Sequence, residues 1–395
     1  MYYYLRRFVK VCVFGALRIV RKIRIIFSKS EKNCLEAEKD EVALKKLEQY
    51  GYKCGLESVE KTMAAITGAK EDPNVELSII VPIYNAQQYI EKLCKSLLNQ
   101  KTKYAYEVIF VDDGSKDDSF KMLSDIAKNN PHMHVFTKQN GGISSARNFG
   151  IDRAVGKHLL FVDNDDYLSE DFVERTLDAA KKENADIVKT AHSEFDPNDH
   201  KRPIVSAPAT VKGYMGEKLK QYNGYVWGSV YSRKMWEKFR FPMGAWYEDM
   251  ITRLILFRAA DGFVYIDSPM YFYYVHAANA SKILWSDKSP KAFDQLFLTM
   301  WLVEYSKALG LKMDKWSYSI VLEELGVYLY SRTLKLDREM VKTAFLIACN
   351  FIAAVRPTGV ELDKTDALLE KCFLTRNFKH YRAVCAYIDS KRRLK

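Results

Sequence analysis

The stretch that decides the fold is Leu77-Ser78-Ile79-Ile80-Val81-Pro82-Ile83-Tyr84-Asn85. Leu77 to Val81 form a short apolar run closed by Pro82, which predicts a strand, and Asn85 can cap a helix that follows it. Further strands are expected at 108–111, 134–137, 158–162 and 185–190, each separated from the next by a helical pattern. This alternation predicts an α/β domain with a mostly parallel sheet covered by helices on both faces.

The sequence outside this domain has no strand pattern. We expect a basic amphipathic helix at 1–30, a helical spacer at 31–75, the α/β domain at 76–285 and a helical C-terminal domain at 286–395. The chain of 395 residues is long enough for two domains with real hydrophobic cores.

Positive charge is concentrated at the start of the chain. Residues 1–29 hold eight Lys and Arg and no Asp or Glu, which leaves 53 basic against 50 acidic residues in the remainder. The nearly neutral body argues against a nucleic-acid partner. A basic arm with an apolar face instead predicts attachment to an anionic membrane surface, the alternative being a helix packed on the protein's own core.

Cysteine usage and hydropathy indicate the compartment. The seven cysteines are scattered and contain no Cys-x-x-Cys pair, so a disulfide framework and a zinc site are both poorly supported. The run from Val11 to Leu17 is far shorter than the ~20 apolar residues of a spanning helix. We therefore expect a cytoplasmic protein, peripheral on the inner face of the cell membrane.

Carboxylates follow two of the predicted strands. Asp112-Asp113-Gly114-Ser115 ends the second strand and Asp163-Asn164-Asp165-Asp166 ends the fourth. Ligands bind beyond the carboxyl ends of parallel strands, and like charges concentrated there call for a cation. Asp163 and Asp165 offer hard oxygen ligands, so we expect Mn²⁺ or Mg²⁺. No P-loop and no Gly-x-Gly-x-x-Gly follows the first strand, which argues against those nucleotide sites.

Five motifs in order resemble those of the family 2 inverting glycosyltransferases with the GT-A fold. They are the stretch at 77–85, Val111-Asp112-Asp113-Gly114-Ser115, the segment 139–150 from Gln139 to Gly150, Phe161-Val162-Asp163-Asn164-Asp165-Asp166, and Phe241-Pro242 with Tyr247-Glu248-Asp249. The resemblance covers roughly residues 76–285 and implies a transferase of the hexosyltransferase class.

The resemblance also implies roles on the donor side. Pro82 and Tyr84 would line the nucleoside pocket, and Asp113 would accept a hydrogen bond from uracil. Asn140 and Arg147 would hold the nucleotide, although Arg147 could instead form a structural salt bridge.

The remaining roles concern the ribose, the metal and the acceptor. Asp163 and Asp165 match the pair at the ribose and the metal. Asp249 matches the catalytic base, and Glu248 beside it would hold the acceptor or orient the base. The alternative for Glu248-Asp249 is a simple helix start.

Two segments depart from the family pattern. Tyr274 stands where relatives commonly carry the first Arg of a basic pair, which leaves His276 as the basic group expected at the diphosphate. The pattern Trp-x-Lys-Leu-Tyr is altered to Trp227-Gly228-Ser229-Val230-Tyr231. Trp227 or Trp246 would either stack on a sugar ring or belong to the core.

The function that these observations predict is transfer of a sugar from a UDP-sugar, with inversion, to a hydroxyl of a membrane-associated glycan or lipid-linked acceptor in cell-envelope polysaccharide biosynthesis. A single base in line with the acceptor hydroxyl gives one displacement and hence inversion. The alternatives are a nucleotidyltransferase on a related α/β fold and a non-catalytic membrane-surface scaffold.

Overall fold

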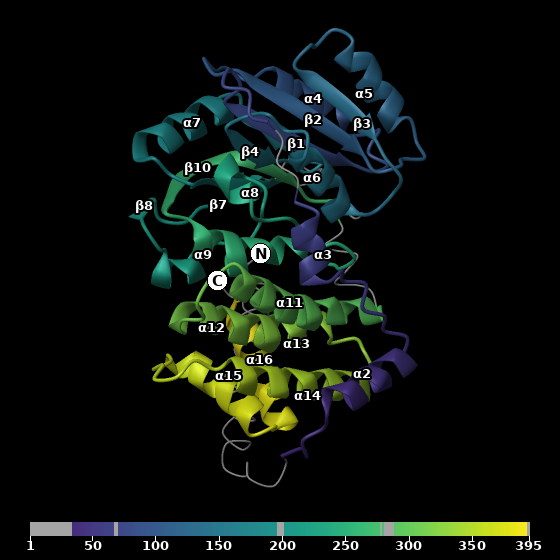
Figure 1. Cartoon of the computed structure of the whole chain (residues 1–395), viewed down its shortest axis with the longest axis vertical. Coiled ribbons are helices and arrows are strands. Elements are labelled where there is room, and N and C mark those ends of the chain that lie inside the picture. The colour runs from purple at the N-terminus through teal and green to yellow at the C-terminus, as the bar shows by residue number, and fades with distance from the viewer. Residues whose placement is uncertain (1–33, 67–69, 196–200, 277–278, 280–287, 393–395) are drawn as a thin grey trace, which may run out of the picture. The chain divides into compact units, whose positions relative to one another are not determined.

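The computed structural model describes residues 34–66, 70–195, 201–276, 279 and 288–392. The chain divides into two compact units. We call residues 54–283 with 301–312 the sheet unit, and residues 1–53, 284–300 and 313–395 the helical unit. Each unit is described by itself, with the elements labelled in Figure 1.

The first half of the sheet is parallel. Its strands lie in the order β3 (Met133–Thr137), β2 (Tyr106–Asp112), β1 (Leu77–Ile83) and β4 (His158–Phe161). Ile80 of β1 is paired with Ile109 on one side and with Phe161 on the other. Because β1 lies between two strands and under helices, all seven of its residues are buried, which explains its continuous apolar sequence.

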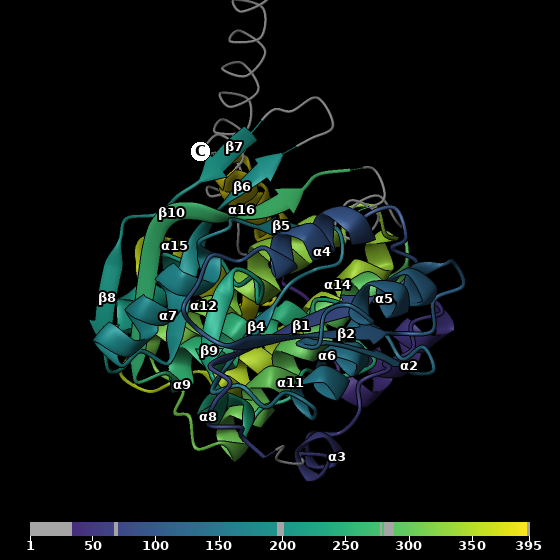
Figure 2. The same ribbon diagram turned by 90° about the horizontal axis from the view of Figure 1, so that it is seen from above.

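The second half of the sheet is mixed. It continues through β9 (Ser229–Ser232), β6 (Ile187–Phe195), β10 (Gly262–Tyr274) and β5 (Tyr167–Leu168), with β7 (Lys201–Ile204) beside β6 and β8 (Ala209–Lys212) beside β10. β9 is antiparallel to both β4 and β6, whereas β10 is parallel to β6. Figure 2 shows the long strand β10 curving. The predicted α/β class is confirmed, and the sheet is parallel only in part.

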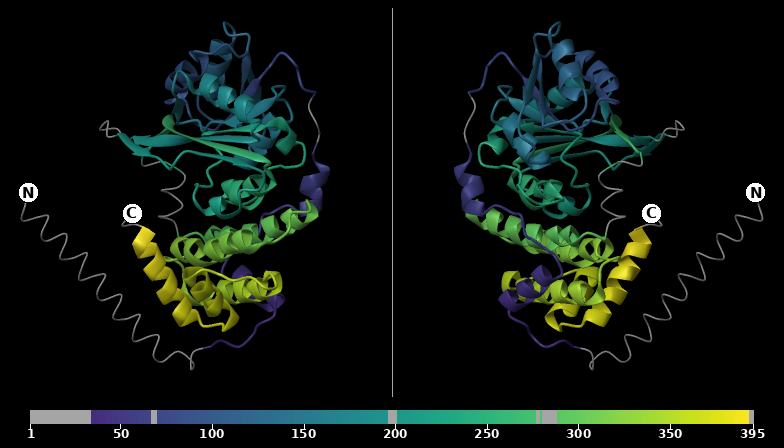
Figure 3. Two further views of the ribbon diagram at one scale, coloured as in Figure 1. Left: turned by 90° about the vertical axis from the view of Figure 1, so that its left-hand side faces the viewer. Right: turned by 90° about the vertical axis from the view of Figure 1, so that its right-hand side faces the viewer.

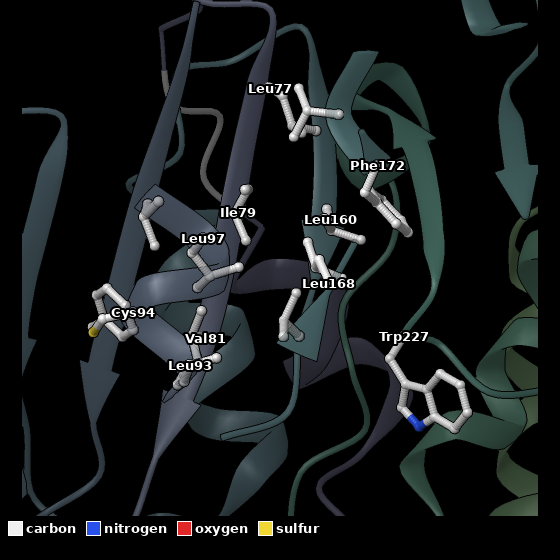
Figure 4. Packing of buried hydrophobic residues seen from close by; sticks show 14 of the residues in the cluster. Leu77, Ile79, Val81, Leu93, Cys94, Leu97, Leu160, Leu168, Phe172 and Trp227 are labelled. Atoms are coloured by element: carbon white, nitrogen blue, oxygen red, sulfur yellow. The ribbon is translucent and has the colours of Figure 1, made fainter. Parts of the chain in front are cut away.

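Helices cover both faces of the sheet. α4 (Ile90–Leu98), α5 (Ser119–Ala127) and α7 (Phe172–Glu183) contribute to one apolar core together with Ile79 and Val81. Figure 4 shows Leu93 and Leu97 of α4 near these β1 side chains. Side chains alternate along a strand, so Ile80 points to the opposite face, where it meets Gly150 of α6 (Ile143–Ile151).

Short elements complete the sheet unit. They are α3 (Val59–Ala64), η2 (Gly216–Lys220), α8 (Arg233–Trp236), η3 (Glu248–Met250), the π-helical turn η4 (Thr252–Leu256) and α9 (Phe257–Ala259). On the α6 face, the rings of Trp236 and Phe241 pack against Phe161 of β4.

The helical unit contains no strand among its described residues, as predicted for the C-terminal region. Its elements are α2 (Asp40–Gln49), η5 (Pro290–Phe293), the start of α11 (Asp294–Ala308), α12 (Lys315–Glu323), η6 (Glu324–Tyr328), α13 (Leu329–Arg332), α14 (Arg338–Val355), α15 (Lys364–Leu374) and α16 (Phe378–Arg392). Figure 3 shows the helices that follow residue 313 gathered into a bundle. Tyr381 is fully buried there against Phe345 and Phe373.

The predicted amphipathic helix at 1–30 lies outside the described residues. Within the ranges that the structure describes, no helix has both the length and the apolar character needed to cross a bilayer.

Candidate active site

A buried arginine joins the donor-side and acceptor-side motifs. Arg147 of α6 is 1% exposed, and its Nη2 donates to Asp163 Oδ1 at 2.7 Å while its Nη1 donates to Glu248 Oε1 at 2.6 Å. Its guanidinium also lies 5.2 Å from the centre of the Phe241 ring. Burial acts to lower the pKa of Arg147, but the two carboxylates outweigh it and raise the pKa. The residue is therefore a permanent cation between two acidic motifs.

This pairing bears on one of the two predictions for Arg147. The salt bridge that the sequence left open is present, because two carboxylates occupy the ends of the guanidinium. The Nε atom is buried without a hydrogen-bond partner in the described part of the chain. Contact of Arg147 with a nucleotide stays a prediction.

Asp165 is linked to the segment that follows β10. Its Oδ2 lies 2.9 Å from His276 Nε2 and accepts a hydrogen bond from Asn279 Nδ2 at 3.2 Å. Burial raises the pKa of Asp165, and the like charge of Asp163 adds to the rise. The structure therefore places His276 beside the Asp-x-Asp pair. Contact of His276 with a diphosphate stays a prediction.

Tyr274, at the position where relatives carry Arg, lies in an aromatic cluster. Its ring centre is 5.1 Å from that of His276 and 4.9 Å from that of Phe195. Lys92 Nζ of α4 lies 5.9 Å from the centre of the Tyr274 ring and 4.0 Å from that of Tyr167. A second basic side chain therefore lies near this segment, one that sequence reasoning missed because α4 is far away along the chain.

Asp166 and Tyr271 anchor the Asp-x-Asp loop to β10. The Tyr271 hydroxyl donates to Asp166 Oδ2 at 2.6 Å and accepts from the Asp163 backbone N–H at 3.1 Å. The Tyr274 backbone N–H donates to the other oxygen of Asp166. Both side chains are fully buried. Sequence reasoning did not find these two anchoring residues, although Asp166 directly follows Asp165 of the Asp-x-Asp pair.

Asp113 follows β2 and is held by the loop that follows β3. Its carboxylate accepts from the backbone N–H of Gly142 at 2.7 Å, from that of Gly141, and from Lys138 Nζ at 2.7 Å. Asn140, in the same loop, is exposed. The loop that holds Asp113 therefore also carries Asn140. Contact of either residue with a nucleotide stays a prediction.

The two predicted residues of the β1 segment differ in exposure. Pro82 is buried within β1, where it is paired with Val111, whereas Tyr84 beyond the strand is 45% exposed. Tyr84 is thus accessible to a ligand at the strand end, while Pro82 shapes the backbone there. Their place in a nucleoside pocket stays a prediction.

Glu248 and Asp249 begin the short helix η3. Tyr247 before them has a φ of 69°, in the left-handed region that favours glycine, so the chain turns sharply into η3. Asp249 is partly exposed, and its charge acts on the buried Lys189 of β6 and on Tyr231 of β9. Lys189 was missed by the sequence reading, although a lysine inside the apolar strand Ile187–Phe195 is itself an unusual signal.

Trp227 belongs to the core. It is 8% exposed, and the rings of Tyr225, Tyr271 and Tyr273 are stacked on it with interplanar angles of 11°, 15° and 7°. Little of its surface is left for a sugar ring. Trp246 is partly exposed and lies edge-on to Tyr247.

The Asp163 and Asp165 side chains fit a divalent cation. Each has one oxygen engaged by a side chain, and no hydrogen bond to a described residue engages Asp163 Oδ2 or the side chain of Asp165 at Oδ1. Burial and the like charge of Asp163 both raise the pKa of Asp165, and a bound cation would stabilise the two carboxylates. Across the described residues, no group of three or more acidic, His or Cys side chains converges on one point, so phosphate and water oxygens would complete the shell.

Comparison with known proteins identifies the domain. Residues 78–240 match the model of the family described as Glycosyl transferase family 2. An uncharacterized glycosyltransferase, EpsJ, of Bacillus subtilis is 35% identical over 208 residues, which cover 50% of this chain and 60% of that protein. YibD, an uncharacterized glycosyltransferase of Escherichia coli, is 30% identical over 223 residues, covering 53% and 64%.

The fold is also found among solved structures. The Staphylococcus aureus TarS fragment 1–349, solved in complex with UDP-GlcNAc, superposes with a TM-score of 0.64 at 20% identity. The match covers 81% of this chain and 93% of that one. The matched region spans less than two thirds of the curated relatives named above. The chain therefore carries a domain of Glycosyl transferase family 2, built on the GT-A fold.

Proposed function

We propose that this protein is an inverting glycosyltransferase that moves a sugar from a UDP-sugar to a hydroxyl of a membrane-associated glycan or lipid-linked acceptor in cell-envelope polysaccharide synthesis. The observation that carries the proposal is the pair of hydrogen bonds from Arg147. One guanidinium group donates to Glu248 of the Glu-Asp motif and to Asp163. A donor held at Asp163 and an acceptor held at Glu248-Asp249 would then meet. The UDP-GlcNAc in the TarS structure supports a UDP-sugar as donor.

Asp249 is the proposed base. Glu248 accepts a hydrogen bond from Arg147 Nη1 at 2.6 Å, so one of its oxygens is already engaged. Asp249 would take the proton of the acceptor hydroxyl as that oxygen attacks the anomeric carbon. One displacement by one base inverts the configuration at that carbon.

The donor is proposed to lie along the strand ends. Asp113, Tyr84, Asn140 and the backbone around Pro82 would hold the nucleoside. Asp163 and Asp165 would hold Mn²⁺ or Mg²⁺, which when bound neutralises charge on the diphosphate. His276 would position Asp165 through the contact of 2.9 Å between them.

The test is release of UDP from a panel of UDP-sugars that includes UDP-GlcNAc, with Mn²⁺ or with a chelator. We expect wild-type protein to release UDP from one sugar, and chelator or Asp165→Ala to suppress this release. Asp249→Asn keeps the shape of the side chain but cannot take a proton, so turnover should fall by roughly 10²–10⁴ with UDP binding retained.

Glu248→Gln is the matched control, because it neutralises the neighbouring carboxylate and spares the proposed base. It should lower turnover less than Asp249→Asn. Retention of more than about a tenth of turnover by Asp249→Asn would show that the base lies elsewhere. Absence of UDP release from every donor by the wild-type protein would reject the proposed function.

A further inference from the structure

A lysine lies fully buried in the sheet unit, where it donates to two neutral oxygen atoms. Lys189 of β6 is 1% exposed. Its Nζ donates to the backbone oxygen of Tyr225 at 3.0 Å and to Ser229 Oγ at 3.3 Å. Among the residues that the structure describes, no carboxylate forms an ion pair with it, and an ammonium carries three donors. Burying a charge on two neutral acceptors is costly, so this lysine calls for an explanation.

The side chain lies on the face of the sheet that carries the candidate active site. Val188 packs with Ala180 of α7, so Lys189, one residue later, points to the other face. Gly150 and therefore α6, which carries Arg147, lie on that other face. Glu248 of η3 bonds to Arg147 there. Lys189 and the Glu-Asp motif thus share one face of the sheet.

The strand pairing places Lys189 beside β9, on the face of the sheet where η3 lies. Lys189 is paired with Ser229 of β9, and Tyr231, two residues further along β9, points to the same face. Burial raises the pKa of Tyr231, with the charges of Arg147 and Asp249 also acting on it. Asp249 is the acidic group that acts on Lys189. Lys189, Tyr231 and the Glu-Asp motif thus lie on the same face of the sheet, and the charge of Asp249 acts on both Lys189 and Tyr231.

We propose that Lys189 is a positioning residue for Asp249, whose buried ammonium favours the carboxylate form of the base and so keeps it ready to take the acceptor proton. This inference rests on the proposed function, because it requires Asp249 to be the base. The ammonium itself does not touch the acceptor or the donor. The Tyr225 carbonyl and the Ser229 hydroxyl fix its place from two different segments of the chain.

The charges around Lys189 set the sign of the effect. Burial lowers the pKa of Lys189 to about 7, and Asp249 from η3 opposes this. His192 on the same strand has a pKa lowered to about 4 by burial and by Lys189, so it is neutral near pH 7. Tyr231 from β9 is neutral as well, because burial raises its pKa. The charge of Lys189 therefore acts on Asp249, and this effect weakens as Lys189 loses its proton.

The first test measures the effect of Asp249 on the titration of Lys189, and it does not depend on catalytic turnover. Full-length protein labelled with ¹³C at lysine Cε is titrated by NMR, and Lys189→Met identifies the Lys189 signal by its loss. We expect Lys189 to titrate near neutrality, well below the other lysines. Asp249→Asn should lower that midpoint by roughly 0.5–1 pH unit, less than the 1–3 units of a direct ion pair. Glu248→Gln, the matched control, should leave it in place.

The second test uses the pH profile of UDP release from UDP-GlcNAc or from whichever UDP-sugar the panel identifies. Lys189→Met fills the site but removes the positive charge that favours the Asp249 carboxylate. The acid limb of the profile, where activity falls as the base takes up a proton, should therefore move to higher pH by roughly 0.5–1 unit. Ser229→Ala, which removes one hydrogen bond and no charge, should leave the limb unmoved.

Two results would overturn the inference. One is an Asp249→Asn protein in which the Lys189 midpoint is unchanged, and the other is a Lys189→Met protein with a wild-type acid limb. Because the NMR titration is independent of activity, a protein without glycosyl transfer would reject the proposed function while still reporting whether Lys189 and Asp249 are coupled.

Discussion

Arg147 shows how one residue joins two motifs, at Asp163 and at Glu248, that are far apart along the chain. Its side chain is 2% exposed, while those of Asp163 and Glu248 are 24% and 15% exposed. A cation so deeply buried needs both carboxylates, and each carboxylate is held at a fixed place by it. The positions of both carboxylates therefore depend on the Arg147 guanidinium group.

Arg147→Met is predicted to destabilise the protein, because it leaves the partly buried carboxylates of Asp163 and Glu248 without their cation. Removing one partner from a buried ion pair typically costs about 3–5 kcal/mol. Arg147→Lys should lose less, since one charge remains, but it cannot bond to both carboxylates at once. Urea unfolding followed by fluorescence measures both variants. Wild-type stability in Arg147→Met would mean that the bridge contributes nothing.

At the scale of elements, the contact between α6 and β1 sets the depth of Arg147. Gly150 lies one turn after Arg147, and a side chain added at Gly150 would place its Cβ 2.5 Å from Ile80 Cγ2. That distance is too short for two carbon atoms, so the helix lies close to the strand only because the residue is glycine. The helix in turn delivers Arg147 to the ends of β4 and to η3.

Gly150→Ala is therefore predicted to push α6 away from β1 and to lower stability by about 1–3 kcal/mol, the usual cost of overpacking. UDP release should fall as well, because Arg147 moves with the helix. Adding Ile80→Ala removes the clashing methyl, so the double variant should lose less than the sum of the two single changes. Strict additivity in chemical denaturation would contradict this account of the contact.

At the scale of the whole molecule, buried histidine links stability to pH. His192 lies against the Trp227 ring, and burial together with Lys189 lowers its pKa from 6.5 to about 4. The unfolded chain binds a proton at His192 below pH 6.5, whereas the folded chain does so only below about pH 4. The unfolded state thus holds more protons between these values, and stability rises with pH across that window.

His192→Gln should flatten this rise, because the substituted side chain does not titrate. The measurement is the melting temperature between pH 4 and pH 6.5 for both proteins, read as the difference between them at each pH. Other histidines contribute equally to both curves and cancel. Parallel curves would show that His192 does not remain neutral in the folded protein.

The basic arm at residues 1–29, outside the described residues, gives a second prediction at this scale. Eight positive charges without a negative one should bind anionic lipid. We expect the full-length protein to sediment with vesicles containing phosphatidylglycerol at low salt and to be released by high salt. Deletion of 1–29 should abolish sedimentation and spare UDP binding. Equal sedimentation with neutral vesicles would exclude an electrostatic attachment.

The sequence by itself determined the alternation of strands and helices and the order of the motifs. Leu77 to Val81 are apolar without interruption because β1 is buried on both faces, and such a run is visible in one dimension. The Asp-x-Asp pair could be recognised because it directly follows a strand. Local patterns of this kind depend on neighbours along the chain.

Only the tertiary structure decided which side chains meet. The antiparallel strand β9 enters the sheet between β4 and β6, and this places Ser229 opposite Lys189. The departure at Ser229 and the lysine inside β6 were both visible in the sequence, but their contact was not. Pairing between strands forty residues apart depends on the packing of the whole sheet, and no local pattern encodes it. The same reason hid the two partners of Arg147, which come from two other segments of the chain.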